Sequence, residues 1–113
     1  MDEVKFEPSY PLWFAAEKTV DGYKYPKGVA KQGKATIDLF LMFTTEGLAA
    51  EFIKEYSGRL DLLAFGVKDE NQLFELTQAL EPMEIYHVFV KTESGQYTVP
   101  IEQIRKRHGK DRV

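Results

Sequence analysis

An unbroken apolar segment, residues 39–43 (Leu-Phe-Leu-Met-Phe), restricts the fold of this chain more than any other feature of its sequence. A strand with one buried face alternates apolar and polar side chains, whereas a continuous apolar run is typical of a strand that is covered on both faces. Together with the residues before it, the run predicts a central strand over residues 35–43. The other predicted elements are placed around this strand.

A helix is predicted directly after the central strand. Thr44 or Thr45 can cap its N-terminus, since a threonine hydroxyl accepts a hydrogen bond from a free backbone N–H of the first turn. Apolar residues then recur at helical spacing over residues 48–56, with charged residues on the opposite side. Gly58 marks the end of this helix, because glycine is the usual residue at a helix C-terminus.

The same pattern then repeats along the chain. A largely apolar run predicts a second strand over residues 60–67, and a third strand is predicted over residues 85–90. Between them, Asp69 and Gln72 resemble a capping box at the start of a second helix, which Pro82 ends. The order strand, helix, strand, helix, strand is a βαβαβ unit, which usually has parallel strands and right-handed crossovers.

The remaining segments complete the predicted fold. Residues 11–16 predict a first strand, and residues 18–34 contain glycines, prolines and lysines that are typical of a surface loop or an irregular hairpin. Residues 96–99 predict a short strand, and Pro100 suits the first position of a last helix. We therefore predict an α/β fold, with α+β as the alternative: a small two-layer or three-layer sandwich with three helices and a mixed sheet of four or five strands.

Length and composition are those of one globular domain. The chain has 113 residues, of which 43% are hydrophobic and 29% are charged. It has no cysteine, which excludes a disulfide scaffold, a thiolate metal site and a cysteine nucleophile. The N-terminal residues lack the features of a signal peptide, and no apolar run reaches the roughly 20 residues of a membrane helix. We therefore expect a cytoplasmic protein outside the membrane, with a single α/β domain over residues 1–104 and a basic C-terminal tail over residues 105–113.

Charge is distributed unevenly along the chain. Residues 105–112 contain five Lys/Arg and one acidic residue, a net charge of +4, whereas the rest contains ten basic and seventeen acidic residues, a net charge of −7. The basic tail could neutralise nucleic-acid phosphates. However, no aromatic residue is interleaved with its charges, and the acidic remainder of the chain would oppose a polyanion. The pattern favours a solubilising tail or a clamp on an acidic surface, and nucleic-acid binding is not expected.

One segment resembles a phosphate-binding P-loop. Residues 28–35 (GVAKQGKA) match its glycine and lysine spacing, but Ala35 replaces the Ser/Thr whose hydroxyl would bind Mg²⁺. A P-loop leaves a strand and opens a helix, so that the helix N-terminus faces the phosphate. Here the segment leaves a loop and enters a strand, which favours a chance resemblance.

The titratable residues form no visible catalytic or metal-binding set. His87 lies in a predicted strand and His108 in the basic tail, so a site with paired histidines is hard to assemble, and a packed or hydrogen-bonded role is favoured for His87. Asp38 and Asp61 lie near the starts of predicted strands, opposite the end at which open α/β sheets bind ligands. We therefore predict no metal site, no cofactor and no catalytic residues.

The carboxyl ends of the three central strands are the best candidate for a ligand site. Two helix N-termini would point there, and their free N–H groups and positive dipole ends suit a small anion. Helix capping and ordinary solvated charges explain the same residues, and a glycine-rich turn is missing. The candidate residues are Thr44, Thr45, Glu46, Lys68, Asp69, Lys91 and Thr92.

Aromatic residues gather before the central strand and offer a second candidate. They could pack over one face of the sheet, or part of them could remain exposed as a protein-contact patch, since Tyr and Trp are typical interface anchors. Both interpretations stay open on the sequence alone. The candidate contact residues are Tyr10, Trp13, Tyr23 and Tyr25.

Two segments carry a resemblance to a known family. Residues 39–52 (LFLMFTTEGLAAEF) resemble the strand-into-helix segment of SseB-like domains, and residues 96–104 (QYTVPIEQI) are similar to their closing strand and the helix that a proline begins. The resemblance covers about residues 12–105, although the loop before Pro100 lacks the family's Asn-Pro form. It implies a small α/β domain, often bacterial, without established catalytic residues.

These observations favour a non-enzymatic bacterial α/β domain that acts through protein contacts, with a partner protein or by self-association. The alternative is a small-ligand or anion-binding domain that uses the loops after the central strands. Catalysis ranks third, because no set of residues supports it.

Overall fold

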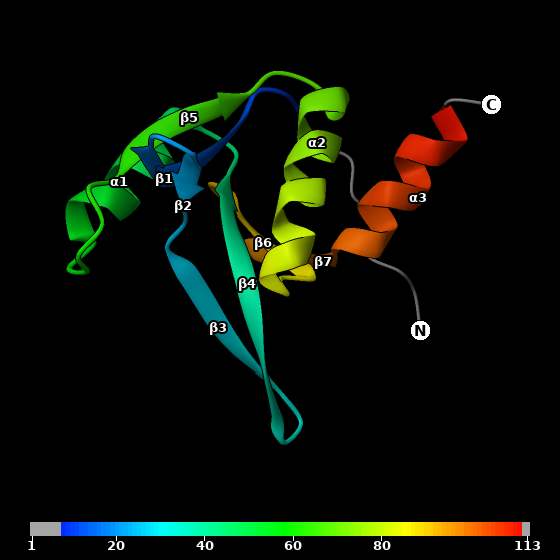
Figure 1. Cartoon of the computed structure of the whole chain (residues 1–113), viewed down its shortest axis with the longest axis horizontal. Coiled ribbons are helices and arrows are strands. Elements are labelled where there is room, and N and C mark those ends of the chain that lie inside the picture. The colour runs from blue at the N-terminus through cyan, green and yellow to red at the C-terminus, as the bar shows by residue number, and fades with distance from the viewer. Residues whose placement is uncertain (1–7, 112–113) are drawn as a thin grey trace.

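Strand β4 (Ala35–Phe43) lies at the centre of a mixed seven-stranded sheet. The structure, a computed structural model, describes residues 8–111, apart from the side chains at positions 27, 32 and 107–111. On one edge β4 pairs in parallel with β6 (His87–Lys91). On its other edge β4 pairs antiparallel with β3 (Lys27–Gln32) and, at its end, with β1 (Leu12–Thr19). The apolar segment therefore forms the central strand that the sequence predicts (Figure 1).

Two hairpins diverge from the point where β1 and β4 meet. β1 pairs with β4 only through Trp13 and Phe14, and then turns back as β2 (Gly22–Lys24). The chain returns to the meeting point and runs outward again as the hairpin of β3 and β4. Gly33, at the tip of this second hairpin, has a φ of 63°, which glycine adopts without the steric cost of a side chain. Figure 1 shows the β3–β4 hairpin extending away from the rest of the molecule.

The predicted number of four or five strands was too low, because residues 18–34 contribute both β2 and β3. Tertiary contacts secure these strands. The rings of Tyr23 and Tyr25 pack against Phe14. Gly28 leaves room for Leu41, whose Cδ2 would lie only 2.7 Å from a Cβ at position 28. The hairpin of β1 and β2 agrees with the irregular hairpin that was one of the two alternatives for this segment, whereas the local turn signals do not indicate the pairing of β3 with β4.

The two remaining strands extend the sheet on either side. β5 (Leu63–Val67) pairs antiparallel with β1, and β7 (Gln96–Pro100) pairs antiparallel with β6. The order across the sheet is β5, β1, β4, β6, β7, with β2 and β3 added on β1 and β4. β4, β5 and β6 run in the same direction, as the βαβαβ unit requires. However, β1 lies between β4 and β5.

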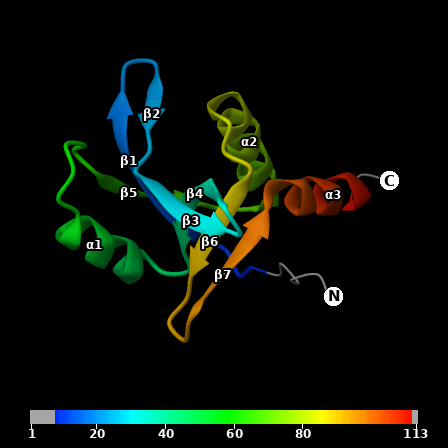
Figure 2. The ribbon, with the colours of Figure 1, turned by 90° about the horizontal axis from the view of Figure 1, so that it is seen from below.

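The helices cover both faces of the sheet. α1 (Glu46–Glu55) connects β4 to β5, and α2 (Glu70–Leu80), followed by the short 3-10 helix η1 (Glu81–Met83), connects β5 to β6. These connections cross the sheet in opposite directions, so right-handed crossovers place α1 and α2 on opposite faces. Figure 2 shows α1 on one side of the strands, with α2 and α3 (Ile101–Asp111) on the other.

Each face has its own buried apolar contacts. On the α1 face, Phe52 packs against Phe43 with ring centroids 5.5 Å apart. Met42, the neighbour of Phe43 in the chain, is fully buried on the opposite face. This is the coverage on both sides that the continuous apolar run predicts. The α2 face holds the main core, formed by Leu12, Phe14, Ala16, Phe40, Met42, Val67, Leu73, Leu80, Ile85, Val88, Val90, Val99, Ile101 and Ile104.

Helix α3 extends into the segment that the sequence analysis treats as a basic tail. It begins after Pro100 and continues to Asp111, and its residues Ile101 and Ile104 are buried in the main core. The helix is therefore anchored at its N-terminal half. The side chains of Arg107, His108 and Lys110 lie outside the described residues, as does all of Arg112.

Candidate functional site

The ends of β4, β5 and β6 lie at one edge of the sheet, where the sequence predicts a ligand site. The Thr44 N–H donates to the Lys91 carbonyl oxygen at 3.1 Å, which holds the ends of β4 and β6 together. β5 ends at Val67, which pairs with Leu12 of β1. The pairing of β1 with β4 begins one residue later, at Trp13. β1 thus separates Lys68 and Asp69 from the other predicted residues.

The polar side chains at this edge mainly hold local structure. Thr45 Oγ1 accepts a hydrogen bond from the Leu48 N–H at 3.1 Å and caps α1. Asp69 Oδ1 accepts from the Gln72 N–H at 2.9 Å, while Gln72 Oε1 accepts from the Lys68 N–H at 2.6 Å. The bond to Asp69 confirms the predicted N-cap, whereas the Gln72 side chain binds the N–H one residue before the N-cap and not that of Asp69, as a standard capping box would. The oxygens of Thr45 and Asp69 are thus occupied by the helices that they begin.

The loop after β6 uses its threonine in the same way. Thr92 Oγ1 donates to the Gly95 carbonyl oxygen at 3.1 Å and accepts from the Ser94 N–H at 3.2 Å, within the turn that leads to β7. Glu46, Lys68 and Lys91 are exposed. Capping and turn formation thus account for the hydrogen bonds observed at this edge, and the charged side chains there are exposed to solvent.

A cluster of five rings lies where the two hairpins diverge. Phe14 is central: its ring centroid lies 5.5 to 5.9 Å from those of Tyr23, Tyr25, Phe40 and Phe65. Tyr23 and Phe65 meet edge to face at 5.1 Å, an arrangement that aromatic quadrupoles favour. Burial raises the pKa of the Tyr25 phenol, and the nearby Tyr23 adds to the effect. The rings therefore form a continuous layer on the α2 face of the sheet.

Part of this layer and its surroundings is open to solvent. Three apolar residues on the α2 face remain 39% (Tyr23), 64% (Val29) and 58% (Leu63) exposed. Strand register places them on this face: Tyr23 pairs with Lys18, Val29 with Asp38 and Leu63 with the core residue Ala16. We call this surface the aromatic face and define it by Tyr23, Val29 and Leu63, with the partly buried Tyr25 and Phe65 beside them.

The four residues predicted for protein contact do not share one surface. Tyr23 and Tyr25 stack with ring centroids 6.2 Å apart and belong to the aromatic face. Trp13 lies on the α1 face, since it pairs with Phe43. Tyr10 is partly buried against the main core. Val29 and Leu63 were not among the predicted residues, because no pattern in the sequence shows which apolar strand residues the helices leave uncovered.

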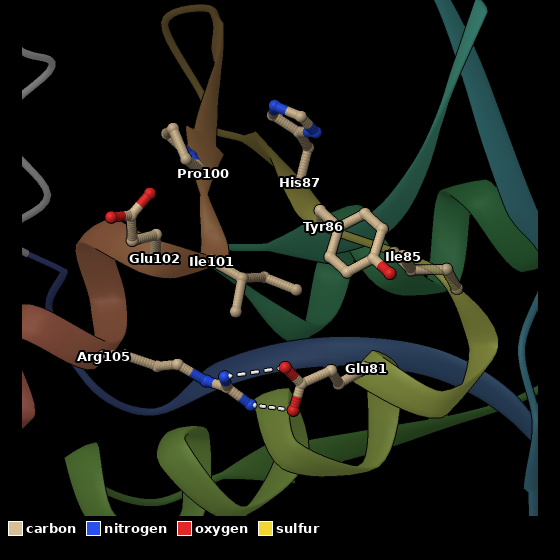
Figure 3. A pocket seen from close by; sticks show the side chains of 8 residues that line it. All are labelled: Glu81, Ile85, Tyr86, His87, Pro100, Ile101, Glu102 and Arg105. Carbon is tan, nitrogen blue, oxygen red and sulfur yellow. Dashed lines mark hydrogen bonds and ion pairs between the residues drawn. The ribbon is translucent and has the colours of Figure 1, made fainter.

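A pocket of about 350 Å³ lies between α3 and the start of β6 (Figure 3). Its residues come from η1, from the turn before β6, from the first residue of β6, from the last residue of β7 and from the beginning of α3. Arg105 donates from NH1 to Glu81 Oε1 at 3.1 Å and from NH2 to Oε2 at 2.7 Å, which joins α3 to η1. The lining residues are Glu81, Ile85, Tyr86, His87, Pro100, Ile101, Glu102 and Arg105.

His87, Pro100 and Arg105 were discussed from the sequence as a strand residue, a helix start and part of the basic tail, but none of them was predicted to line a pocket. Glu81 and Arg105 are 24 positions apart, so no local spacing links them. The pocket also lies at the start of β6, the opposite end from the predicted ligand residues. Its position depends on how α3 folds back beside the end of α2.

The other candidate residues lie apart from one another. The P-loop-like segment forms β3 and the hairpin tip, with no helix behind it. Asp38 is half-buried in β4, whereas Asp61 is exposed before β5, where its N–H donates to Glu17 Oε1 at 2.9 Å. In the described part of the chain, no group of three His, Asp or Glu residues could hold a metal ion. His108 lies in α3, and its side chain is outside that part.

Comparison with known proteins adds no family assignment. No protein-family model matches the chain, and a search of curated proteins finds no match to its sequence. The resemblance to SseB-like domains stays a prediction. Within residues 8–111, no helix combines the length and the apolar character that crossing a bilayer requires.

Proposed function

We propose that this chain acts through protein contacts and recognises its partner with the aromatic face. The observation that carries the proposal is the joint exposure of Tyr23, Val29 and Leu63 on one side of the sheet. An exposed tyrosine with other exposed apolar side chains on the same side of the sheet favours an interaction site, because tyrosine is a frequent anchor in such sites. The ring layer beneath supports Tyr23 against Phe14 and Phe65, so the anchor is held in place before binding.

The surrounding charges indicate the chemistry of the partner. Lys18 is exposed and lies beside Tyr23 in the strand pairing, and Lys31 is exposed two residues after Val29 on the same face of β3. Asp38 lies opposite Val29 on the same face but is half-buried, whereas both lysines are exposed. A partner with apolar side chains at its centre and acidic side chains at its rim therefore suits this face. The proposed partner is therefore a protein with an acidic surface around an apolar patch.

The alternative, a ligand site at the strand ends, has less support. Thr45, Asp69 and Thr92 already use their side-chain oxygens for capping and turn bonds. An anion would have to compete with these local bonds for the same N–H groups. The aromatic face, by contrast, exposes apolar area whose burial against another molecule would be favourable.

Affinity capture with matched variants tests the proposal. The double substitution Tyr23→Ser and Leu63→Ser removes the two exposed anchors, while Val20→Ser changes an apolar residue at the tip of the β1–β2 hairpin that is fully exposed and outside the aromatic face. We expect partners enriched by the wild type and by Val20→Ser to be lost with the double variant. Circular dichroism should show that all three proteins are folded. Equal recovery of the partners by the double variant would overturn the proposal.

Lysine cross-linking locates the contact independently. Lys18 and Lys31 border the aromatic face, whereas Lys68 and Lys91 lie exposed at the strand ends. We expect an amine-reactive cross-linker to join the partner to the first pair. Cross-links confined to the second pair would place the contact at the strand ends and contradict the proposal. If the partner is a second copy of the chain, light scattering should show a dimer that the double variant loses.

A further inference from the structure

We propose that two copies of this chain pair through the free edge of β5 and form one continuous sheet. β5 lies at a border of the sheet, along the top of the molecule in Figure 1. All of its residues pair with β1, and within residues 8–111 no strand pairs with its other side. Such an edge presents unpaired N–H and C=O groups, which another strand can bind by main-chain hydrogen bonds.

β5 differs in composition from the other strands at the borders of the sheet. Its sequence, Leu-Ala-Phe-Gly-Val, contains neither a charged residue nor a proline. By contrast, β2 carries Lys24, β3 carries Lys31 and β7 ends with Pro100. Lysine and proline protect a free edge, because an added strand must desolvate the charge or lose a hydrogen bond. Within the described strands, β5 is therefore the border strand that lacks this protection.

The inner side of β5 holds the strand in place along its whole length. The pairing with β1 is continuous from Leu12 with Val67 to Ala16 with Leu63, without a bulge. The segment that enters β5 is tied to β1 as well, since the Asp61 N–H donates to the Glu17 carboxylate at 2.9 Å. A strand fixed in this way loses little further freedom when a second strand pairs with it.

The composition of β5 suits pairing with itself. Two identical strands that pair antiparallel are related by a two-fold axis perpendicular to the sheet. Each side chain of β5 then meets one from the same uncharged set, so that no like charges face each other. Leu63, which is 58% exposed, gains cover from apolar side chains of the partner's β5. A second copy therefore matches this edge in both its main-chain groups and its side chains.

This pairing goes beyond the proposed contact and does not depend on it. The perpendicular axis keeps the α2 faces of both copies on the same side of the joint sheet. The two aromatic faces then lie side by side and remain accessible, apart from the cover that Leu63 gains. A dimer of this kind presents two contact surfaces to a partner.

Analytical ultracentrifugation of the wild type and of a β5 variant tests the inference. Two five-residue strands form a contact smaller than a standard interface, so we expect a reversible dimer with a Kd on the order of 100 μM. Gly66→Lys places a charge on β5 and should weaken the dimer about tenfold. A Cβ at position 66 lies 3.5 Å from the Trp13 ring, which is an ordinary contact, so the variant should fold.

Gly95→Lys is the matched control. It adds the same charge in the turn before β7, where a Cβ meets nothing within 4 Å, and neither glycine has a positive φ. We expect this variant to associate like the wild type. A wild type that is monomeric at about 1 mM would overturn the inference. So would undiminished association of Gly66→Lys, or equal weakening by both variants.

Amide hydrogen exchange locates the contact. The β5 amides that point away from β1 should exchange more slowly at high than at low protein concentration, whereas the exchange of β7 amides should not change. Protection that appears at β7 or β3 instead of β5 would reject the pairing through β5. Protection of β5 only after another protein is added would assign the edge to that protein and would also reject self-pairing.

Tyr23→Ser separates this inference from the proposed function. Tyr23 belongs to β2, so its substitution leaves the β5 edge in place, and we expect the variant to form the dimer. A dimer that Tyr23→Ser loses and Gly66→Lys keeps would be formed by the aromatic face and would reject the edge. A monomeric wild type that still captures its partner would reject this inference alone. A dimer lost only with Gly66→Lys, with partner capture unchanged by the double variant of the aromatic face, would support the edge and reject the proposed function.

Discussion

Arg105 and Glu81 join α3 to the end of α2 through two parallel hydrogen bonds, of 3.1 and 2.7 Å, between the guanidinium and the carboxylate. These bonds, together with the positive charge of Arg105, hold the pKa of the Glu81 carboxyl below its ordinary value. They also raise the pKa of Arg105. The pair connects two helices on one face of the sheet and closes one end of the pocket.

The ion pair makes stability depend on pH in acid. Because the pKa of Glu81 is lower in the folded than in the unfolded protein, its contribution is complete above the unfolded value of about 4.3 and is lost as the pH falls through the folded value. We expect Glu81→Gln to lower the urea midpoint slightly at pH 7 and to have less effect near pH 3. Glu55→Gln, which removes an exposed charge on α1, is the control. A difference between wild type and Glu81→Gln that is independent of pH would contradict this account.

The N-cap of α1 provides a second prediction. Thr45 accepts a hydrogen bond from the Leu48 N–H, so Thr45→Ala should destabilise the protein by about 1 kcal/mol. For the adjacent Thr44 no side-chain hydrogen bond is found within the described residues, so Thr44→Ala should have a smaller effect. Chemical denaturation of both variants checks this. Equal losses would show that the cap is not the source of the stability.

The half-buried phenol of Tyr25 predicts a change at alkaline pH. Burial raises the pKa of Tyr25, and also that of Tyr97. A raised pKa means that stability falls as the pH rises above about 10, since the unfolded chain ionises first. We expect Tyr25→Phe to remove part of the latest phase of tyrosine ionisation, measured by absorbance at 295 nm. The variant should also lose less stability at high pH. An unchanged late phase would mean that Tyr25 is not the buried group.

Glu84 adopts a backbone conformation that glycine accepts more easily. Its φ of 60° follows η1, where its N–H donates to the Glu81 carbonyl oxygen at 3.0 Å. The left-handed region costs a residue with a Cβ roughly 1 to 2 kcal/mol, part of which glycine loses again through its greater freedom when unfolded. Glu84→Gly should therefore stabilise the protein by about 0.5 kcal/mol. Glu75→Gly, within α2, should instead destabilise it by about 1 kcal/mol. The two melting temperatures should move in opposite directions.

Substitutions of one leucine in the core and one on the aromatic face should have different effects on stability. Leu80 is fully buried, so Leu80→Ala should cost about 2 to 5 kcal/mol by leaving a cavity. Leu63 is 58% exposed, and Leu63→Ala should change the free energy of unfolding by about 0.5 kcal/mol or less. Urea denaturation measures both. A large loss at Leu63 would assign that side chain to the core and would weaken its role as a contact residue.

Some features of the fold could be predicted because they depend on neighbours in the chain. The apolar run that ends at Phe43 required cover on both faces, and Phe52 and the main core provide it. The capping residues Thr45 and Asp69 were recognisable because an N-cap bond spans only three residues. Two of the three helix starts are thus explained by local hydrogen bonding.

The tertiary structure decided how these elements are combined. β1 lies between β4 and β5 because it pairs with both strands, which are distant from it in the sequence. Helix capping and hydrophobic periodicity do not indicate which strands pair. The same contacts turn residues 18–34 into β2 and β3 and collect the five rings around Phe14. The packing of α3 against the end of α2 brings Glu81 to Arg105, and the helices leave Leu63 uncovered beside the buried Ala16. The sequence alone therefore determined where the helices begin and which segments form the main strands, since these depend on local bonds and periodicity. Both candidate surfaces arise only when distant segments meet.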